Sequence, residues 1–422
     1  MKEQLSYESG WVNHLGLVLK RGTWTNFSWD FSAAVFFSVF NAVFGQFYIP
    51  MALRNGATNL EVGLLSAAPA IGLLFSPLWA NALSGRELKP FVVYPNLLAR
   101  ASLVAVAVYP KPWMFVGVSL LVNFLGGIQA PAYAAFVTRM YPHLLRGRLM
   151  GYVRVALGMA LVPVTYGVGL WFARSGSSGP LTAAAVTGVI SILLFANAQE
   201  VEATAHTSTP RLGVSQQWEM VRSNRPLAIF LVATTLSGFG NMLASPLYQI
   251  FQIHQLNLTD SQISLTRMVY YGVLLVAYFV IGWVIDHLSP KVAMLGGIAA
   301  YIVVPLLYAV GGTYGAVMVA SGFQGMGDAA WDIGAMTYIF KSSPGREASA
   351  FGMHLMLFGV RGSIGPMLGT ALSHSLSPVW IWYSAAAFGL MGYVVLFDPH
   401  HRGRGVSTMS WLRRAGLGIP PH

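Results

Sequence analysis

The chain has 422 residues, of which 55% are hydrophobic and only 9% are charged, whereas roughly a quarter of the residues in a typical soluble protein are charged. This composition excludes an ordinary water-soluble domain. The formal net charge is +11, and the absence of cysteine excludes disulfide bonds, thiol catalysis and cysteine-ligated metal sites.

Residues 1–26 are expected to form a cytoplasmic N-terminal segment. Within it, WVNHLGLVLKRG at 11–22 indicates a short helix along the membrane surface, with a disordered leader as the alternative. The apolar residues at helical spacing there are Trp11, Val12, Leu15, Val18 and Leu19. The first long apolar run has no small-residue cleavage site, so we expect no removable signal peptide.

Long apolar runs then recur along the chain with short polar gaps, and each is near the roughly 20 residues needed to cross a bilayer as a helix. The predicted spans are 28–50, 60–83, 90–109, 113–138, 148–172, 179–198, 226–252, 262–285, 290–310, 314–340, 351–373 and 376–397. Strands crossing a membrane would be shorter and alternating. The predicted fold class is therefore an all-α integral membrane protein with twelve transmembrane helices.

Lysine and arginine are unevenly distributed over the predicted loops. If the N-terminus is cytoplasmic, most cations fall on the inside. The outside keeps only Arg54, Lys111, Arg174 and Arg267. We expect a monomeric, multi-pass plasma-membrane protein with both termini in the cytoplasm, ending in a basic tail at 398–422. Its positive charge would then face anionic lipid rather than nucleic acid.

The sequence contains a weak internal repeat with an offset of about 200 residues. FVTRMYPHLLRGRLMGYVRVALG at 136–158 aligns with YIFKSSPGREASAFGMHLMLFG at 338–359, and NLEVGLL at 59–65 aligns with DSQISLT at 260–266. The polar segment 199–225 lies between the two copies. We interpret it as a cytoplasmic linker between two six-helix domains, 27–198 and 226–397.

Three short stretches of the sequence, 282–291, 141–151 and 158–167, carry recognisable motifs. GWVIDHLSPK at 282–291 resembles the G-x-x-x-D-R-x-G-R-K loop of the major facilitator superfamily, and Gly282, Asp286 and Lys291 match it. The corresponding loop at 77–90 is degenerate, with Asn81 at the position of the acid.

Two further stretches resemble the same family. YPHLLRGRLMG at 141–151 is similar to its connection between helices 4 and 5, which includes Arg146. GMALVPVTYG at 158–167 is similar to the helix 5 pattern of its drug/proton antiporters, retaining Gly158 and Pro163. The resemblance implies two pseudo-symmetric halves that alternate in access. It also implies that Gly282, Asp286, Lys291, Arg146, Gly158 and Pro163 act in gating.

Four charged residues fall clearly at membrane depth, where each costs about 2.5–3.5 kcal/mol to insert. They are Asp328, Asp332, Arg361 and Arg100. Asp328 and Asp332 share one helix face. Burial and mutual repulsion favour protonation of at least one of them, whereas a nearby arginine opposes it.

The role of Asp328 has three interpretations. It can form a static salt bridge with Arg361, because both lie near the middle of the membrane. It can cap a helix after a break at GMG, 325–327. It can bind a proton or substrate, because irregular backbone at mid-membrane is typical of transporter sites. For Arg100 we expect carbonyl contacts near Pro95 or a cross-domain contact, and for Asp30 an interfacial role or proton coupling.

Neutral polar residues recur on the spans that line the central cavity in the resembled family. They are Asn41 and Gln46, Gln129 and Tyr133, Asn241 and Gln249, and Trp331. With few fixed charges, this set suits a moderately apolar organic solute, and a sugar site would use similar residues.

No G-x-x-x-x-G-K-[ST] loop is present, so ATP is not the expected energy source. No cofactor or metal is expected, and no clustered nucleophile indicates an enzyme. The sequence predicts a secondary transporter that uses protons to export a small organic solute. A proton-coupled uptake symporter of a sugar or other metabolite is the alternative. A non-transporting membrane receptor or scaffold is the alternative from another class.

Overall fold

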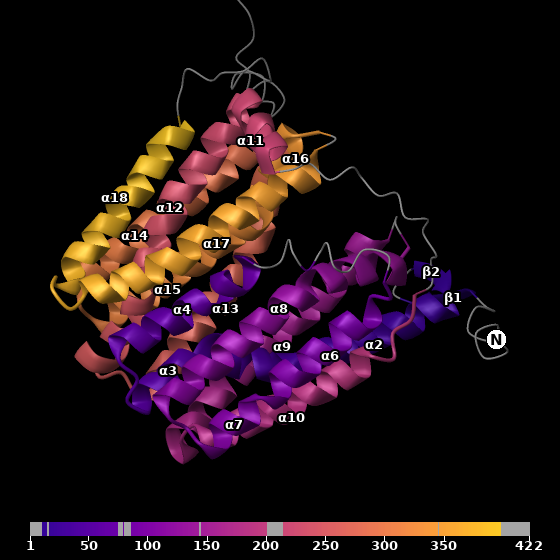
Figure 1. Ribbon diagram of the computed structural model, residues 1–422, viewed down its shortest axis with the longest axis horizontal. Coiled ribbons are helices and arrows are strands. Elements are labelled where there is room, and N and C mark those ends of the chain that lie inside the picture. The colour runs from indigo at the N-terminus through magenta and orange to yellow at the C-terminus, as the bar shows by residue number, and fades with distance from the viewer. Residues whose placement is uncertain are drawn as a thin grey trace, which may run out of the picture.

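The computed structural model describes residues 11–14, 17–74, 79, 86–142, 145–200, 214–344 and 346–397. Ten helices within these residues are long and apolar enough to cross a membrane. A helix satisfies its backbone hydrogen bonds internally, which lipid requires because it offers no partners. The all-α membrane fold is therefore as the hydropathy predicts (Figure 1).

The helices up to residue 195 form what we call the N-terminal half. In chain order they are α2 (Arg21–Phe40), η1 (Asn41–Phe47), α3 (Tyr48–Arg54), α4 (Asn59–Leu74), α6 (Lys89–Ala101), α7 (Leu103–Val108), α8 (Pro112–Met140), α9 (Arg146–Ser175) and α10 (Ser178–Phe195). The first three form one span, which begins several residues before the predicted position 28. The predicted second span, 60–83, continues beyond Leu74 into residues outside the described part of the chain.

The later helices form the C-terminal half, preceded by α11 (Val214–Ser223) in the predicted linker. They are α12 (Arg225–Ile250), η2 (Phe251–Gln255), α13 (Asp260–His287), α14 (Pro290–Gly311), α15 (Tyr314–Ala329), η3 (Ala330–Ala335), α16 (Met336–Ser342), α17 (Glu347–Leu372) and α18 (Pro378–Phe397). The short α4 and the broken run α15–η3–α16 occupy the two places that complete the expected twelve spans.

Local sequence explains where several helices begin and end. The Thr259 hydroxyl accepts a hydrogen bond from the Gln262 backbone N–H, and the Gln262 side-chain oxygen accepts one from the Thr259 N–H, forming a capping box before α13. The Ser289 hydroxyl accepts a hydrogen bond from the Val292 backbone N–H and so caps the start of α14. Gly312, at φ 54°, ends α14 in the left-handed conformation that glycine adopts without steric cost.

The N-terminal stretch is not the surface helix that the apolar spacing predicted. It forms an antiparallel strand pair, β1 (Trp11–His14) and β2 (Leu17–Lys20), in which Trp11 lies opposite Lys20. Aromatic and β-branched residues such as Trp11, Val12 and Val18 favour strands. Five apolar residues at helical spacing were too few to decide the structure.

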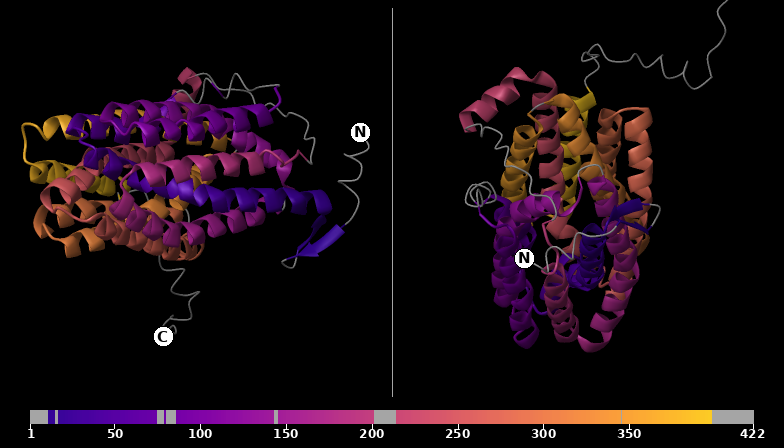
Figure 2. Two further views of the ribbon diagram at one scale, coloured as in Figure 1. Left: turned by 90° about the horizontal axis from the view of Figure 1, so that it is seen from below. Right: turned by 90° about the vertical axis from the view of Figure 1, so that its right-hand side faces the viewer.

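The buried side chains divide the molecule into a joined end and a separated end. One large apolar cluster contains residues of both halves, including Phe47 and Phe251. A second cluster, with Phe136 and Tyr141, belongs to the N-terminal half, and a third, with Phe230 and Ile339, to the C-terminal half. The two single-half clusters lie at the end where α2 and α12 begin, which is the predicted cytoplasmic end. Figures 1 and 2 show the two groups of helices converging away from that end.

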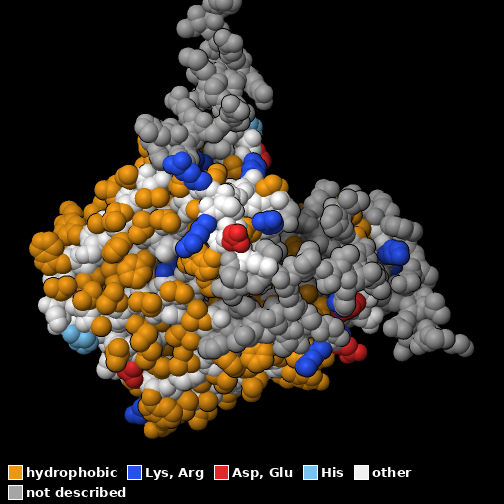
Figure 3. Space-filling view, turned by 45° about the horizontal axis from the view of Figure 1, so that its top comes forward, with side chains coloured by type: hydrophobic (Ala, Val, Ile, Leu, Met, Phe, Trp, Pro, Cys, Tyr) orange, Lys and Arg blue, Asp and Glu red, His pale blue; other side chains and the backbone are white. Residues whose placement is uncertain are grey.

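Two helix pairs carry most of the packing between the halves, α4 with α17 and α9 with α13. Large hydrophobic side chains such as Val276, Phe279 and Trp283 of α13 are exposed on the surface, and Figure 3 shows broad apolar areas with lysine and arginine at their margins. Such a surface is compatible with lipid contact and not with water, because exposed apolar patches of this extent promote association.

Candidate functional site

A carboxylate held by neutral side chains lies at the centre of the candidate site. Asp328 of α15 accepts a hydrogen bond from the Tyr270 hydroxyl of α13 (2.6 Å) and another from the Tyr301 hydroxyl of α14. The Gln324 amide, one turn earlier on α15, donates a third at 3.2 Å. Three helices of one half therefore position a single acid, which is partly buried.

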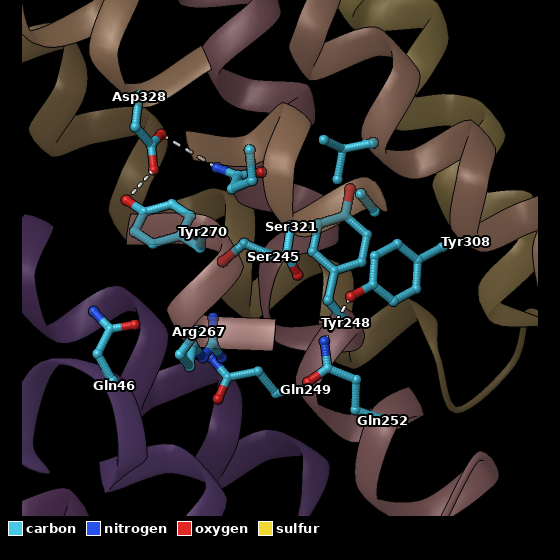
Figure 4. Close-up of a pocket in the computed structure, with 13 residues that line it drawn as sticks. Gln46, Ser245, Tyr248, Gln249, Gln252, Arg267, Tyr270, Tyr308, Ser321 and Asp328 are labelled. Carbon is cyan, nitrogen blue, oxygen red and sulfur yellow. Dashed lines mark hydrogen bonds between the residues drawn. The ribbon is translucent and has the colours of Figure 1, made fainter. Parts of the chain in front are cut away.

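Asp328 opens onto a pocket of about 180 Å³, as Figure 4 shows. Its lining residues are Gln46, Ser245, Tyr248, Gln249, Gln252, Arg267, Tyr270, Val304, Tyr308, Ala320, Ser321, Gln324 and Asp328. All but Gln46 belong to the C-terminal half. Pockets for drug-sized ligands measure roughly 300–1,000 Å³, so this conformation admits only a small molecule.

Gln46 connects the pocket to the other half of the molecule. Its amide nitrogen lies 2.6 Å from the Tyr271 hydroxyl, the neighbour of Tyr270 on α13. The residue is part of η1, whereas Tyr271 is buried in α13. A movement of the halves relative to one another would therefore change the surroundings of Tyr270 and Asp328.

Three spans next to the pocket contain π-helical segments, namely η1, η2 and η3. π-Helical turns are rare and frequently occur at functional sites, because they widen the helix and re-aim side chains. Asp328 lies in regular α-helix, and the irregularity begins at Ala330. The interpretation of Asp328 as a helix cap after a break at 325–327 is therefore wrong.

Asp332 and Arg361 lie close to this site but outside the pocket. Asp332 is exposed and accepts a hydrogen bond from the Tyr278 hydroxyl at 2.7 Å. Arg361 is buried, donates to the Thr234 carbonyl at 2.8 Å and lies over the Trp331 ring at 5.4 Å. Asp328 and Arg361 do not form the ion pair that their depth suggested, because each is turned to partners on other helices.

Arg267 is the main functional candidate that the sequence analysis missed. It was assigned to the outside loops, yet it lines the pocket from α13, one helical turn before Tyr270. Its position near the predicted edge of span 262–285 gave no sign of this. The tyrosines that hold Asp328 were also missed, because Tyr270 and Tyr301 lie 58 and 27 residues from it in sequence.

The other predicted binding residues are spread more widely. Gln46 and Gln249 line the pocket with Asp328, whereas Asn41, Gln129, Tyr133, Asn241 and Trp331 do not. Tyr133 packs on Phe195 inside the N-terminal half, with ring centroids 5.5 Å apart. The Asn241 side-chain oxygen is buried and has no hydrogen-bond partner.

Arg100 and Asp30 have their partners within the N-terminal half. Arg100 is buried, donates to the Gly188 carbonyl at 2.8 Å and lies over the Phe37 ring at 4.8 Å. The expected contact is thus to a carbonyl, although to one on α10 rather than near Pro95 or across the domains. Asp30 is buried and accepts a hydrogen bond from the Tyr141 hydroxyl at 2.8 Å.

The predicted gating residues occupy the expected helix ends and one contact between the halves. Asp286 is exposed in the last turn of α13, four residues after Gly282, and Lys291 lies in the first turn of α14. Gly158 of α9 faces Leu275 of α13, and Pro163 is exposed within α9. Arg146 begins α9, and its side chain lies outside the described part of the structure.

A family profile described as the Major Facilitator Superfamily matches residues 31–236 and 230–417. A search of curated protein sequences gave no match. Among solved structures, the chain is similar to the nucleoside transporter NupG, with 15% identity over 88% of this chain and 97% of that chain and a TM-score of 0.69.

Two other solved structures have the same fold. A bacterial homologue of the human lysosomal transporter Spinster, in an inward-facing and unoccupied conformation, matches with 12% identity over 89% of this chain and 97% of that chain and a TM-score of 0.64. The POT family transporter PepTSo matches with 9% identity over 93% of this chain and 99% of that chain and a TM-score of 0.69. At these identities the likeness concerns the fold.

Proposed function

This chain belongs to the major facilitator superfamily and is a transporter, and we propose that it moves a small organic solute through the pocket beside Asp328 by proton-coupled alternating access. The main support is one observation. Asp328 is a pocket-lining carboxylate whose hydrogen-bond donors are all neutral side chains, Tyr270, Tyr301 and Gln324.

Such an acid suits proton coupling for a physical reason. A carboxylate in a salt bridge is held in its charged form by the partner, so it exchanges protons poorly. The described residues include ion pairs of Arg54 with Asp260 and of Arg139 with Glu200, but none with Asp328. Neutral tyrosine and glutamine side chains can serve either form of the acid, because a hydroxyl both donates and accepts.

Alternating access is supported by the unequal ends of the molecule. Within the described residues, the hydrogen bonds and ion pairs between the halves lie at the pocket, where Gln46 meets Tyr271, and at the end remote from the start of α2. At that remote end, Arg54 binds Asp260, and the Asn59 amide donates to the Ser373 hydroxyl at 3.3 Å. With the predicted topology, both termini are cytoplasmic and the conformation is inward-facing, as the Spinster homologue is described.

The direction of transport is part of the proposal. The antiporter-like motif at 158–167 favours efflux, and an uptake symporter is the alternative. Our proposal keeps the protein as a monomer in the plasma membrane. The similar structures include a nucleoside transporter and a POT family transporter, so polar metabolites such as nucleosides belong among the solutes to be tested. The residues around Asp328 favour hydrogen bonding over purely apolar recognition.

The proposal is tested with purified protein in liposomes that trap a pH indicator. Solutes are added with or without an imposed pH gradient, and protein-free liposomes are the control. A solute-dependent proton flux, together with solute accumulation that the gradient drives, is the expected result. If solutes cross at the same rate with and without the gradient, proton coupling is excluded; if none crosses faster than in protein-free liposomes, transport of these solutes is excluded.

A further inference from the structure

Arg267 introduces a positive charge into a pocket whose other lining residues, apart from Asp328, are neutral. It lies three residues before Tyr270 on α13, so both side chains leave the helix on neighbouring positions of one face. Figure 4 shows Arg267 beside Gln249 and on the other side of Tyr270 from Asp328. The cation and the acid of the pocket are thus set apart by a tyrosine.

Within the described residues, Arg267 makes no ion pair and no hydrogen bond, and its Nε atom is buried without a partner. The acid two turns earlier on the same helix, Asp260, is already bound to Arg54. A partly buried charge without a partner is unfavourable. No acceptor among the described residues binds its five N–H groups, so a ligand can use them.

Two other arginines of the chain show what a structural role looks like. Arg100 and Arg361 are both buried, and each binds a backbone carbonyl and lies over aromatic rings. Arg267 has neither kind of contact among the described residues. The difference favours a role for Arg267 that is completed only when a solute is present.

The neighbours of Arg267 add further donors. The Tyr248 hydroxyl is buried and has no partner. The Tyr308 hydroxyl accepts a hydrogen bond from Gln252 at 2.6 Å, which leaves its own hydrogen free to donate. Tyr248 and Tyr308 stack with ring centroids 4.3 Å apart, and both line the pocket. A guanidinium that shares its pocket with a tyrosine hydroxyl donor suits an anion.

We infer that the transported solute is a small organic anion, carrying a carboxylate or a phosphate group that binds Arg267. The inference rests on the proposed function, since it assigns the solute of the same pocket. Arg267 binds the anionic group, and Asp328, on the far side of Tyr270, is protonated and deprotonated during transport. A neutral solute would leave the Arg267 charge uncompensated in the loaded state.

The test measures binding, which does not depend on transport. Full-length protein in detergent is titrated with lactate, benzoate, glycerol 3-phosphate, uridine and glucose by calorimetry and by the shift in thermal unfolding temperature. The variants are Arg267→Gln and Arg267→Lys, with Arg174→Gln as a matched control, because Arg174 is exposed at the end of α9 and lines no part of the pocket. Size-exclusion profiles establish that each variant is folded.

At least one anion is expected to bind the wild type and to bind Arg267→Gln about tenfold more weakly or worse, since a charge-assisted contact is lost. Arg267→Lys should recover part of the affinity, because it keeps the charge but loses the planar fork, and Arg174→Gln should bind like the wild type. The relative affinities for carboxylates and glycerol 3-phosphate distinguish the two anionic groups. Absence of anion binding, or anion affinity unchanged in Arg267→Gln, overturns the inference. Gradient-driven flux of uridine or glucose in liposomes would then still uphold the proposed function.

Discussion

Arg54 and Asp260 join the two halves of the transporter, with Arg54 Nε 3.2 Å from Asp260 Oδ1. Arg54 ends the first span and also donates to the Leu258 carbonyl at 2.6 Å, so it holds the whole start of α13. The contact lies at the joined end of the molecule, opposite the end where the single-half clusters separate. The Arg54–Asp260 ion pair must therefore break whenever the joined end opens.

Breaking this ion pair should favour the conformation in which that end is open. Exposed ion pairs contribute about 0.2–1 kcal/mol, so Arg54→Gln or Asp260→Asn should change the ratio of conformers by roughly up to fivefold. The charge-reversed double variant Arg54→Asp with Asp260→Arg should restore much of the wild-type ratio. Distances between spin labels on the exposed residues Leu60 and Ser375 would show this, and equal distributions in all four proteins would mean that the pair does not act as a gate.

Arg361 should stabilise the C-terminal half independently of Asp328. Its guanidinium binds the Thr234 carbonyl and lies within 5.5 Å of the centroids of the Trp331 and Phe358 rings. Arg361→Gln removes a charge-assisted hydrogen bond and two cation–π contacts, and we expect it to lower the free energy of unfolding by about 1–3 kcal/mol. Arg361→Lys should rescue only part of this loss.

A double-mutant cycle distinguishes this arrangement from a salt bridge. Since Asp328 and Arg361 have separate hydrogen-bond partners, the effects of Asp328→Asn and Arg361→Gln on the free energy of unfolding should add. Chemical denaturation of the four proteins in detergent would measure it. A double variant markedly more stable than the sum of the single effects would show that the two charges compensate each other after all.

Two glycines at helix contacts should respond differently to alanine. A Cβ on Gly158 would meet Leu275 Cδ2 at 2.9 Å, the end of a flexible side chain on the other half. A Cβ on Gly365 would meet Met242 Cβ at 2.9 Å and the Leu243 backbone nitrogen at 3.2 Å, which cannot move aside easily. Gly158→Ala should therefore unfold at nearly the wild-type temperature, while Gly365→Ala should lose about 1–3 kcal/mol. Equal losses would contradict this account of the packing.

We predict that Asp286 acts as a gating residue at the separated end of the molecule. It is exposed at the C-terminus of α13, and in the outward-open conformation it would approach the positive N-terminal end of α9. Asp286→Asn should raise the inward-open population by about two- to fivefold, as the loss of a 0.3–1 kcal/mol helix-dipole contact implies. Spin labels on the two halves at the separated end would report this shift. An unchanged distance distribution would exclude a gating role.

Much of the fold could be predicted because lipid imposes one strong rule. Long apolar runs with hydrogen bonds to satisfy must be helices, so span positions follow from hydropathy. The same rule singled out Asp328, since an acid at membrane depth is costly and calls for a function. The short N-terminal segment lies outside this rule, and its strand pair was mistaken for a helix.

The partners within the site could not be predicted in the same way. Which hydroxyls reach Asp328 depends on how α13, α14 and α15 pack, and tyrosines are common enough in membrane helices to give no signal by themselves. Arg361 was expected beside Asp328 from depth alone, but depth does not fix the rotation of a helix about its axis. Arg267 was overlooked because a cation near a span boundary resembles an ordinary loop residue.

The central claim is that Asp328 couples protons to solute movement, and transport by Asp328→Asn tests it most directly. Wild-type and variant proteins are reconstituted at equal density, and uptake of the radiolabelled solute panel is measured under a pH gradient and, separately, as exchange with solute trapped inside. Asn keeps the size of the side chain and can still hydrogen-bond the tyrosines. The variant is expected to lose gradient-driven accumulation while it retains exchange. Accumulation by Asp328→Asn at the wild-type level under the same gradient would contradict the account.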